Sequence, residues 1–233
     1  QLLHLLDHLF HGHCGLVGFH QQVLKFIDVM TDYGNPNYWN ERYAADSHGA
    51  FDWYQPYLTL KMHLMPMLSV RPDFEILIPG CGNSPLGACL FNDGYKNITS
   101  VDISTVVIKQ MAARHAATPE LEFLPADMTN LDGVPNEAFD LVIDKALLDS
   151  MLCGDESFDK AMLMLAESYR VLKPGGKYVV VSYGVPSSRV ALLEEGLSWT
   201  VEVVEIPKPP VEEFVGVETD KCHYMYICTK SSL

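Results

Sequence analysis

A short apolar segment that ends in a glycine turn limits most strongly what this chain can fold into. Residues 75–84 read Glu-Ile-Leu-Ile-Pro-Gly-Cys-Gly-Asn-Ser, and the next apolar run closes on a lone acidic residue, Asp102. In parallel sheets, such glycines let backbone N–H groups approach a ligand, and an acidic residue about 20 positions further on accepts hydrogen bonds from a ribose diol. The pattern therefore predicts a nucleoside site at the end of a parallel sheet.

The sequence of the turn argues against a dinucleotide as the ligand. A dinucleotide fingerprint places a third glycine three residues after Gly82, and Pro85 stands there instead. A third strand-like run ends in Asp127, which is placed to accept from an adenine amino group, and a fourth ends in Asp144 and Lys145. An adenosine with an amino-acid tail needs such strand-end groups, so we predict S-adenosyl-L-methionine as the cofactor.

The rest of the chain alternates between strand-like and helix-like runs. We expect strands at 76–79, 98–102, 121–124, 139–143 and 177–183, with helices at 84–92, 104–115 and 157–172. Two further strand-like runs, 199–206 and 222–229, have no convincing helix between them. The expected fold is therefore α/β, a Rossmann-like, doubly wound, seven-stranded and mostly parallel sheet with an antiparallel C-terminal edge hairpin.

The first 32 residues differ in composition from the remainder. Their leucines could stripe a helix, and their histidine spacing invites a metal-site interpretation: His4, His8, His11, His13 and His20. Only Asp7 and Cys14 could complete a ligand framework, so we expect no metal. We expect residues 1–32 to be an N-terminal extension, helical or dispensable for chemistry, and residues 33–233 to be the catalytic domain.

The charge and the cysteines of the chain limit which binding partners and which cellular compartment are expected. The formal net charge of −14 argues against nucleic acid and is explained either by a basic protein partner or by solubility alone. The six cysteines form no C-x-x-C pair and are typical of reduced thiols, which predicts a cytosolic or nuclear compartment; of the two we expect a cytoplasmic location. No apolar run reaches the roughly 20 residues of a membrane span, so we expect no membrane association. No pattern indicates an oligomeric state.

Residues 33–57 are dense in aromatic side chains with polar residues between them. Because this mixture does not form a regular core stripe, it favours a lid over the site, with ordinary hydrophobic packing as the alternative. Within it, Trp39, Tyr43 and Trp53 could wall the cofactor and present a π-face to a cation. The aromatic residues are Tyr33, Tyr38, Trp39, Tyr43, Phe51, Trp53, Tyr54 and Tyr57.

Several motifs together resemble those of class I, seven-stranded, S-adenosylmethionine-dependent methyltransferases. They are Tyr38-Trp-x-x-Arg-Tyr43, Phe51-Asp-Trp-Tyr54, Gly80-Cys-Gly-Asn-Ser84, Asp144-Lys145 and Leu148-Asp149. The chain is most similar to the eukaryotic branch of elongation factor 1-alpha lysine methyltransferases, of the type associated with endothelin-converting enzyme 2, from about Tyr33 to Thr229. The resemblance implies a protein-lysine N-methyltransferase that acts on a basic, lysine-bearing translation factor such as elongation factor 1-alpha.

The resemblance also implies cofactor contacts, and the chain departs from the family pattern in two places. The implied cofactor-binding residues are Trp39, Tyr43, Trp53, Gly80, Asp102, Ile103, Asp127, Met128 and Lys145, to which the turn adds Gly82. Ile78 stands where many members carry an acidic residue. Lys145-Ala-Leu-Leu-Asp149 stands where related enzymes read Lys-Gly-Thr-Leu-Asp, beside the expected acceptor pocket.

The expected catalytic groups follow from the chemistry of a lysine acceptor. Its amine must be neutral to attack, against a reference pKa of about 10.4. Asp144 or Asp149 could orient the incoming ammonium and help it lose a proton. The structural alternatives are a salt bridge of Asp144 and Lys145 to neighbours and a helix cap for Asp149. Cys81 has no paired histidine nearby in sequence and is not expected to be a nucleophile.

Two other functions stay open at this point. One is a methyltransferase for a small molecule, although the short connector at 184–198 supplies no capping domain and favours an open cleft. The other is a non-catalytic scaffold that binds the cofactor. The glycine turn and both carboxylates argue against a scaffold.

Overall fold

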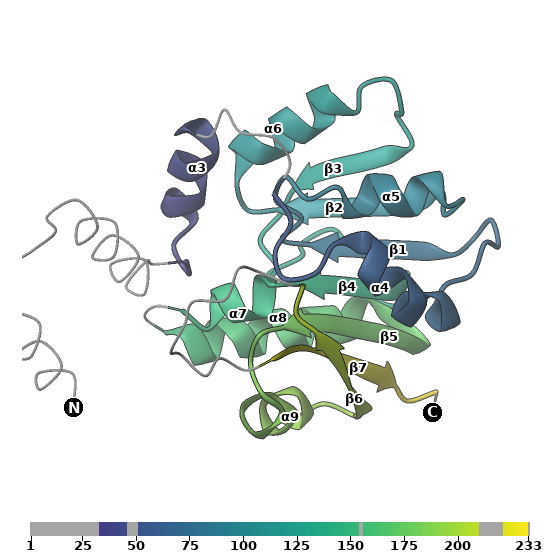
Figure 1. Ribbon diagram of the computed structural model, residues 1–233, viewed down its shortest axis with the longest axis vertical. Helices are drawn as coiled ribbons and strands as arrows, with labels where there is room; N and C mark the ends of the chain where they lie inside the picture. The colour runs from purple at the N-terminus through teal and green to yellow at the C-terminus, as the bar shows by residue number, and fades with distance from the viewer. Residues whose placement is uncertain (1–32, 46–50, 154–155, 210–220, 233) are drawn as a thin grey trace, which may run out of the picture. The chain divides into compact units, whose positions relative to one another are not determined.

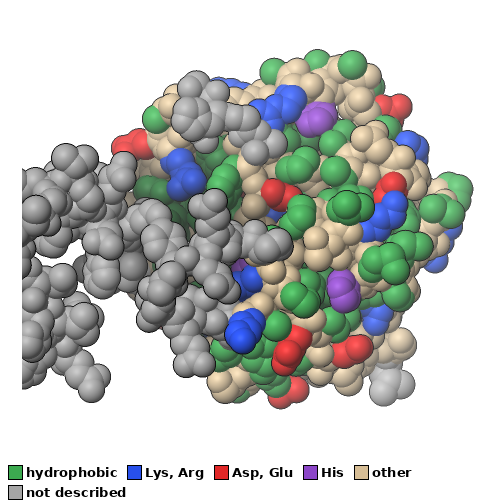
Figure 2. Space-filling model, in the orientation of Figure 1, with side chains coloured by type: hydrophobic (Ala, Val, Ile, Leu, Met, Phe, Trp, Pro, Cys, Tyr) green, Lys and Arg blue, Asp and Glu red, His purple; other side chains and the backbone are tan. Residues whose placement is uncertain are grey.

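The computed structural model (Figures 1 and 2) describes residues 33–45, 51–153, 156–209 and 221–232. The predicted extension over residues 1–32, with its five histidines, lies outside the described residues. No helix in the described part of the chain is long and apolar enough to cross a membrane.

A seven-stranded sheet forms the centre of the domain (Figure 1). The first five strands in chain order pair in parallel, and the last two pair antiparallel at one edge. This arrangement confirms the predicted fold class. The order across the sheet is β3 (Leu121–Pro125), β2 (Asn97–Asp102), β1 (Glu75–Pro79), β4 (Phe139–Lys145), β5 (Leu172–Ser182), β7 (Cys222–Lys230) and β6 (Trp199–Pro207).

The register of the parallel strands brings their carboxyl ends to one edge. Pro79 pairs with Val101, and Asp102 pairs with Pro125, so β1, β2 and β3 end side by side. The chain leaves β1 into the glycine turn at the same level at which β2 ends in Asp102. Groups that are distant in sequence therefore meet at this edge, as expected for a ligand site of an open α/β sheet.

Helices cover both faces of the sheet because successive strand side chains point to opposite sides. Ile76 and Ile78 belong to one core, which includes side chains of α4, α5 and α6, whereas Leu77 belongs to the other, which includes side chains of α7, α8 and α9. The helices are α3 (Pro36–Ala45), α4 (Tyr57–Leu64), the 3-10 helix η2 (Met65–Met67), α5 (Leu86–Asn92), α6 (Thr105–Arg114), α7 (Leu147–Met151), α8 (Ser157–Val171) and α9 (Pro186–Glu194).

The structure differs from the predicted elements in a few places. The connector at 184–198 contains α9, and the short helix α7 follows β4; neither helix was predicted. The helix α4 ends at Leu64 and continues as η2, because a proline in η2 cannot donate the next helical hydrogen bond. β5 begins at Leu172 rather than at 177, with a register shift against β4 between Phe139 and Leu141.

Candidate active site

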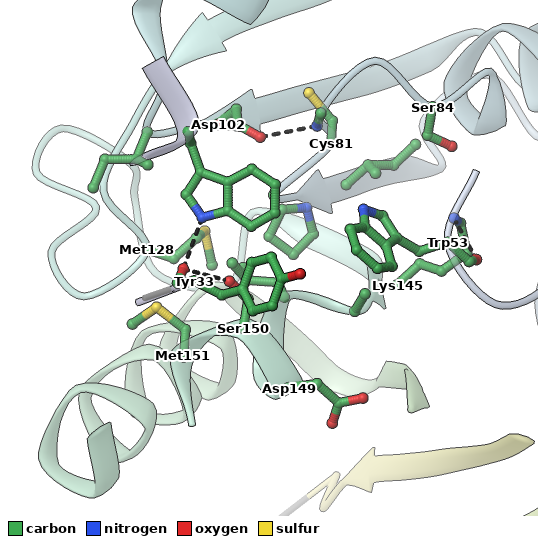
Figure 3. Close-up of a pocket in the computed structure, with 18 of the residues that line it drawn as sticks. Tyr33, Trp53, Cys81, Ser84, Asp102, Met128, Lys145, Asp149, Ser150 and Met151 are labelled. Atoms are coloured by element: carbon green, nitrogen blue, oxygen red, sulfur yellow. Dashed lines mark hydrogen bonds between the residues drawn. The ribbon is translucent and has the colours of Figure 1, made fainter. Parts of the chain in front are cut away.

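A cavity lies at the carboxyl ends of β1, β2 and β4, beneath the aromatic segment (Figure 3). All ten predicted cofactor-binding residues line it, and so does Asp149. The sequence-distant groups expected to form one site are therefore adjacent in the structure. These residues are Trp39, Tyr43, Trp53, Gly80, Gly82, Asp102, Ile103, Asp127, Met128 and Lys145.

The glycine turn forms a tight cradle at the floor of this cavity. Gly80 and Gly82 have φ values of +56° and +51°, in the left-handed region that glycine adopts most readily. A Cβ on Gly82 would lie 2.6 Å from the hydroxyl of Tyr43, and one on Gly80 would lie 2.9 Å from the side chain of Leu147. Both positions therefore require glycine, and both line the cavity without a side chain.

The carboxylate of Asp102 holds the glycine turn through a hydrogen bond to its backbone. Its Oδ2 accepts a hydrogen bond of 2.9 Å from the Gly82 N–H, and its Oδ1 accepts one of 2.9 Å from the Ser104 N–H. Burial raises the pKa of Asp102, and these two N–H donors oppose that rise. The carboxylate therefore lines the cavity in a fixed orientation, with lone pairs left for a ligand hydroxyl.

The chain after β2 and β3 supplies the next part of the lining. Ile103 is 38% exposed and Met128 is buried, so both present apolar surface at the cavity. Asp127 is exposed, and its Oδ1 accepts hydrogen bonds from the backbone N–H and the hydroxyl of Thr129. An apolar slot with a carboxylate at one end suits an adenine ring with an exocyclic amino group.

Six aromatic residues form one side of the cavity, which we call the aromatic wall: Tyr33, Trp39, Tyr43, Phe51, Trp53 and Tyr54. The carbonyl of Tyr33 accepts hydrogen bonds from the Trp39 indole (2.7 Å) and from the Ser150 hydroxyl (2.8 Å), as Figure 3 shows. Arg42 lies 5.8 Å from the Trp39 ring and 5.7 Å from the ring of Trp53. These contacts join α3 to the 51–54 loop and to α7.

Polar contacts hold the 51–54 loop against the sheet. The Nζ of Lys145 lies 2.6 Å from Asp52 Oδ1 and donates to the Trp53 carbonyl at 3.0 Å. The hydroxyl of Ser84 donates to the same Asp52 oxygen, at 2.6 Å. Burial lowers the pKa of Lys145, and the charge of Asp52 opposes that effect. Lys145 was predicted to contact the cofactor, and in the structure it holds the loop in place at the cavity edge.

Asp149 accepts hydrogen bonds from several elements at once. Its Oδ2 accepts from the Tyr54 hydroxyl and from the Tyr183 N–H, each at 2.9 Å. Its Oδ1 accepts from the Ser182 hydroxyl at 2.6 Å and from Arg189 Nη2 at 3.0 Å. The carboxylate is therefore paired with a guanidinium and connects the aromatic wall to β5 and α9.

Asp144, the other predicted catalytic carboxylate, does not line the cavity. It is fully buried, and it accepts hydrogen bonds from the N–H groups of Leu147 and Leu148 and from the Tyr178 hydroxyl. Successive strand residues point to opposite faces, so Lys145 reaches the cavity edge while Asp144 points away. This corrects the predicted placement: Asp144 bonds the first turn of α7, the capping role considered for Asp149. Burial raises the pKa of Asp144 to about 7.

Sequence reasoning missed three polar residues of this site. Asp52 stands inside the motif Phe51-Asp-Trp-Tyr54, in which no role was assigned to the carboxylate. Ser84 closes the glycine motif without having been assigned a role. Arg189 lies 40 positions after Asp149, and no sequence spacing connects the two.

The residues that the structure describes contain no group of three or more side chains suited to hold a metal ion. The absence of a metal stays a prediction.

Comparison with known proteins gives matches to methyltransferases. A family model described as "Methyltransferase domain" matches residues 77–180. "EEF1A lysine methyltransferase 4" of Bos taurus is 35% identical over 178 residues, which cover 72% of this chain and 68% of that protein. "eEF1A lysine and N-terminal methyltransferase" of Bos taurus is 39% identical over 154 residues, which are 65% of this chain and only 22% of that protein. The chain thus spans about a fifth of the length of that relative.

A solved structure of a SAM-dependent methyltransferase from Methanosarcina mazei matches 78% of this chain and 99% of that one. Its TM-score is 0.55 and its identity is 21%, so it supports the fold alone.

The sheet order and the cavity at the strand ends define a class I methyltransferase fold. The match to EEF1A lysine methyltransferase 4 of Bos taurus, at 35% identity over 68% of that protein, then shows the family. This chain belongs to the family of methyltransferase-domain proteins that includes that enzyme.

Proposed function

We propose that the chain binds S-adenosylmethionine in the cavity and transfers a methyl group to a lysine side chain of a protein. The observation that carries the proposal is the glycine cradle of Gly80 and Gly82, which shares one cavity with the strand-end carboxylates of Asp102 and Asp127. Tyr43 and Leu147 pack where a Cβ would stand, and the bare backbone of both glycines lines the cavity, which suits close approach of a ligand. Membership of a methyltransferase family supports the same cofactor.

Each part of the cavity has a role in this proposal. Asp102 would accept hydrogen bonds from the ribose, Asp127 would accept from the adenine amino group, and Ile103 would pack against the ring. When bound, S-adenosylmethionine supplies a methyl group on a sulfonium, and the acceptor nitrogen forms an N–C bond while the C–S electron pair stays on sulfur. The aromatic wall would exclude water and orient the acceptor.

The relatives' names and the charge of the chain support a protein acceptor. Two relatives are named as methyltransferases of eEF1A lysine. A chain with a net charge of −14 is suited to dock a basic protein, since opposite potentials steer association. We therefore propose elongation factor 1-alpha as the substrate, a catalytic domain spanning residues 33–233, and a cytoplasmic location.

The test incubates the purified full chain with methyl-labelled cofactor and purified elongation factor 1-alpha. We expect label on one or more lysines of the factor, located by mass spectrometry. Calorimetry should give a cofactor Kd that Asp102→Asn weakens by about tenfold, the value of a hydrogen bond to a charged group. Asp132→Asn is the matched control, because Asp132 is exposed and does not line this cavity. Tight binding without any labelled protein would contradict the proposed activity and favour a scaffold.

A further inference from the structure

The described charged residues that line the cavity are all engaged by other groups of the chain. Asp102 accepts from two backbone N–H groups, and Asp127 accepts from Thr129. Lys145 is paired with Asp52, and Asp149 is paired with Arg189. An amine that enters beside Asp149 would therefore meet a carboxylate that is already neutralised and accepting several hydrogen bonds, so another atom must orient it.

Tyr54 presents a suitable atom at the same place. Tyr54 and Asp149 both line the cavity, and the hydrogen bond between them lies at its wall. The phenol has a single proton and donates it to Asp149, so toward any further partner its oxygen can only accept a hydrogen bond. Burial and the charge of Asp149 raise the pKa of Tyr54, which keeps it a neutral phenol.

The backbone of Tyr54 is held in an unusual conformation. Its φ of +64° lies in the left-handed region, which a bulky residue adopts only when its surroundings impose it. The next residue, Gln55, is fully buried, and its side-chain amide donates to the Pro207 carbonyl at 2.8 Å. The position of the Tyr54 side chain is therefore fixed twice: its backbone is held by the buried neighbour Gln55, and its hydroxyl is held by the hydrogen bond to Asp149.

Arg189 supports this arrangement from outside the cavity. Its Nη2 and Nε lie 3.0 Å and 3.3 Å from Asp149 Oδ1, and its side chain is largely buried. The guanidinium lies against Gly184, where an added Cβ would overlap it. Together with the Ser182 hydroxyl, the guanidinium holds Oδ1, which leaves Oδ2 directed at Tyr54.

We propose that the Tyr54 oxygen accepts a hydrogen bond from the amine of the methyl acceptor, and that Asp149 and Arg189 are positioning residues for this phenol. The inference rests on the proposed function and adds the residue that orients the acceptor. An amine whose N–H is held by Tyr54 keeps its lone pair free to face the methyl group. The Tyr54 oxygen can accept an N–H from either the neutral or the protonated amine, and only the neutral amine has the lone pair that attacks the methyl group.

The test uses sinefungin, a cofactor analogue that carries an amino group on the carbon that replaces the sulfonium centre. Binding of sinefungin and of S-adenosylhomocysteine is measured by calorimetry, which needs no turnover. In Tyr54→Phe, we expect the preference for sinefungin over S-adenosylhomocysteine to fall about tenfold, with the S-adenosylhomocysteine Kd changed by less than about twofold. An unchanged preference would overturn the inference.

Tyr57→Phe is the matched control, because it also removes a tyrosine–aspartate hydrogen bond, to Asp93, at a position that does not line the cavity. Its preference for sinefungin should equal that of the unmodified chain. A second variant, Gly184→Ala, displaces the Arg189 guanidinium and leaves Tyr54 and Asp149 in place. We expect it to lower the preference by about threefold. No change in Gly184→Ala would remove Arg189 from the positioning role.

Transfer assays separate this inference from the proposed function. If the unmodified chain binds both analogues but labels no protein, and Tyr54→Phe still lowers the sinefungin preference, the proposed substrate is wrong and the role of Tyr54 as an amine-binding residue stands. If the chain labels elongation factor 1-alpha and Tyr54→Phe retains the full preference and the full kcat, the proposed function stands and the role of Tyr54 is wrong.

Discussion

Replacing Ala146 with glycine is expected to stabilise the protein, because Ala146 occupies a backbone conformation that favours glycine. Its φ is +80°, and it stands where related enzymes were expected to carry glycine. A left-handed conformation costs a residue with a Cβ about 1–2 kcal/mol. The backbone N–H of Ala146 donates to the Val181 carbonyl at 3.1 Å, and this hydrogen bond does not depend on the side chain.

Two opposing effects reduce the expected gain. The unfolded chain is more flexible with glycine at this position than with alanine, which lowers the free energy of unfolding by about 0.5–1 kcal/mol. The methyl group of Ala146 is only half-buried, so its loss removes less than about 0.8 kcal/mol of burial. The net expectation is a gain of about 0.5 kcal/mol, which raises the Tm of a chain of this size by about 1–2 °C.

The assay is urea unfolding of the full chain, followed by far-UV circular dichroism at equilibrium. Ala112→Gly is the matched control, because Ala112 is exposed on the helix α6 and the same substitution there should lower stability by about 1 kcal/mol. The two variants should therefore differ in sign. A loss of stability in Ala146→Gly equal to that in Ala112→Gly would refute the reasoning.

Three further predictions follow from the site. Trp53→Ala should raise the cofactor Kd at least tenfold, because it removes a ring of the aromatic wall; unchanged binding in calorimetry would exclude Trp53 from the site. Lys145→Met should lower the free energy of unfolding by about 2 kcal/mol, less than for a fully buried pair because Asp52 is 19% exposed, and a double-mutant cycle with Asp52→Asn should show coupling. Additive effects in that cycle would contradict the pairing. The raised pKa of Asp144, about 7, means that the folded state binds an extra proton between about pH 4 and 7, so the contribution of Asp144 to stability falls as the pH rises through this range. Asp144→Asn should reduce that decline when urea unfolding is compared at pH 5 and pH 8, and an identical pH dependence in both proteins would contradict it.

The sheet and its ligand edge could be predicted from the sequence because their signals are local. Apolar runs that end in the glycine turn, at Asp102 and at Asp127 mark strand ends, and parallel pairing then places those ends together. α7 escaped prediction because it has only five residues, and α9 because its apolar pattern is weak. α9 buries a single side chain, Leu193, and so has no clear apolar stripe.

The roles of the polar residues could not be predicted because they depend on direction and on long-range contacts. Asp144 and Lys145 are adjacent in sequence, yet one bonds the first turn of α7 and the other holds the 51–54 loop. The sequence predicted Asp149 to be a catalytic carboxylate or a helix cap, and only the structure shows that Arg189 forms an ion pair with it. Such an ion pair leaves no spacing signal in a single sequence.

The way the aromatic wall is attached has a consequence for how the protein acquires its ligand site. Tyr33, Trp53 and Tyr54 bond to Ser150, Lys145 and Asp149 across 117, 92 and 95 positions of the chain. During synthesis on the ribosome, the aromatic residues are made long before their hydrogen-bond partners. The aromatic wall therefore cannot form these contacts until β4 and α7 have been synthesised. Competence to bind a nucleoside is therefore a late event of biogenesis, and a ligand present in the cell stabilises only the finished molecule.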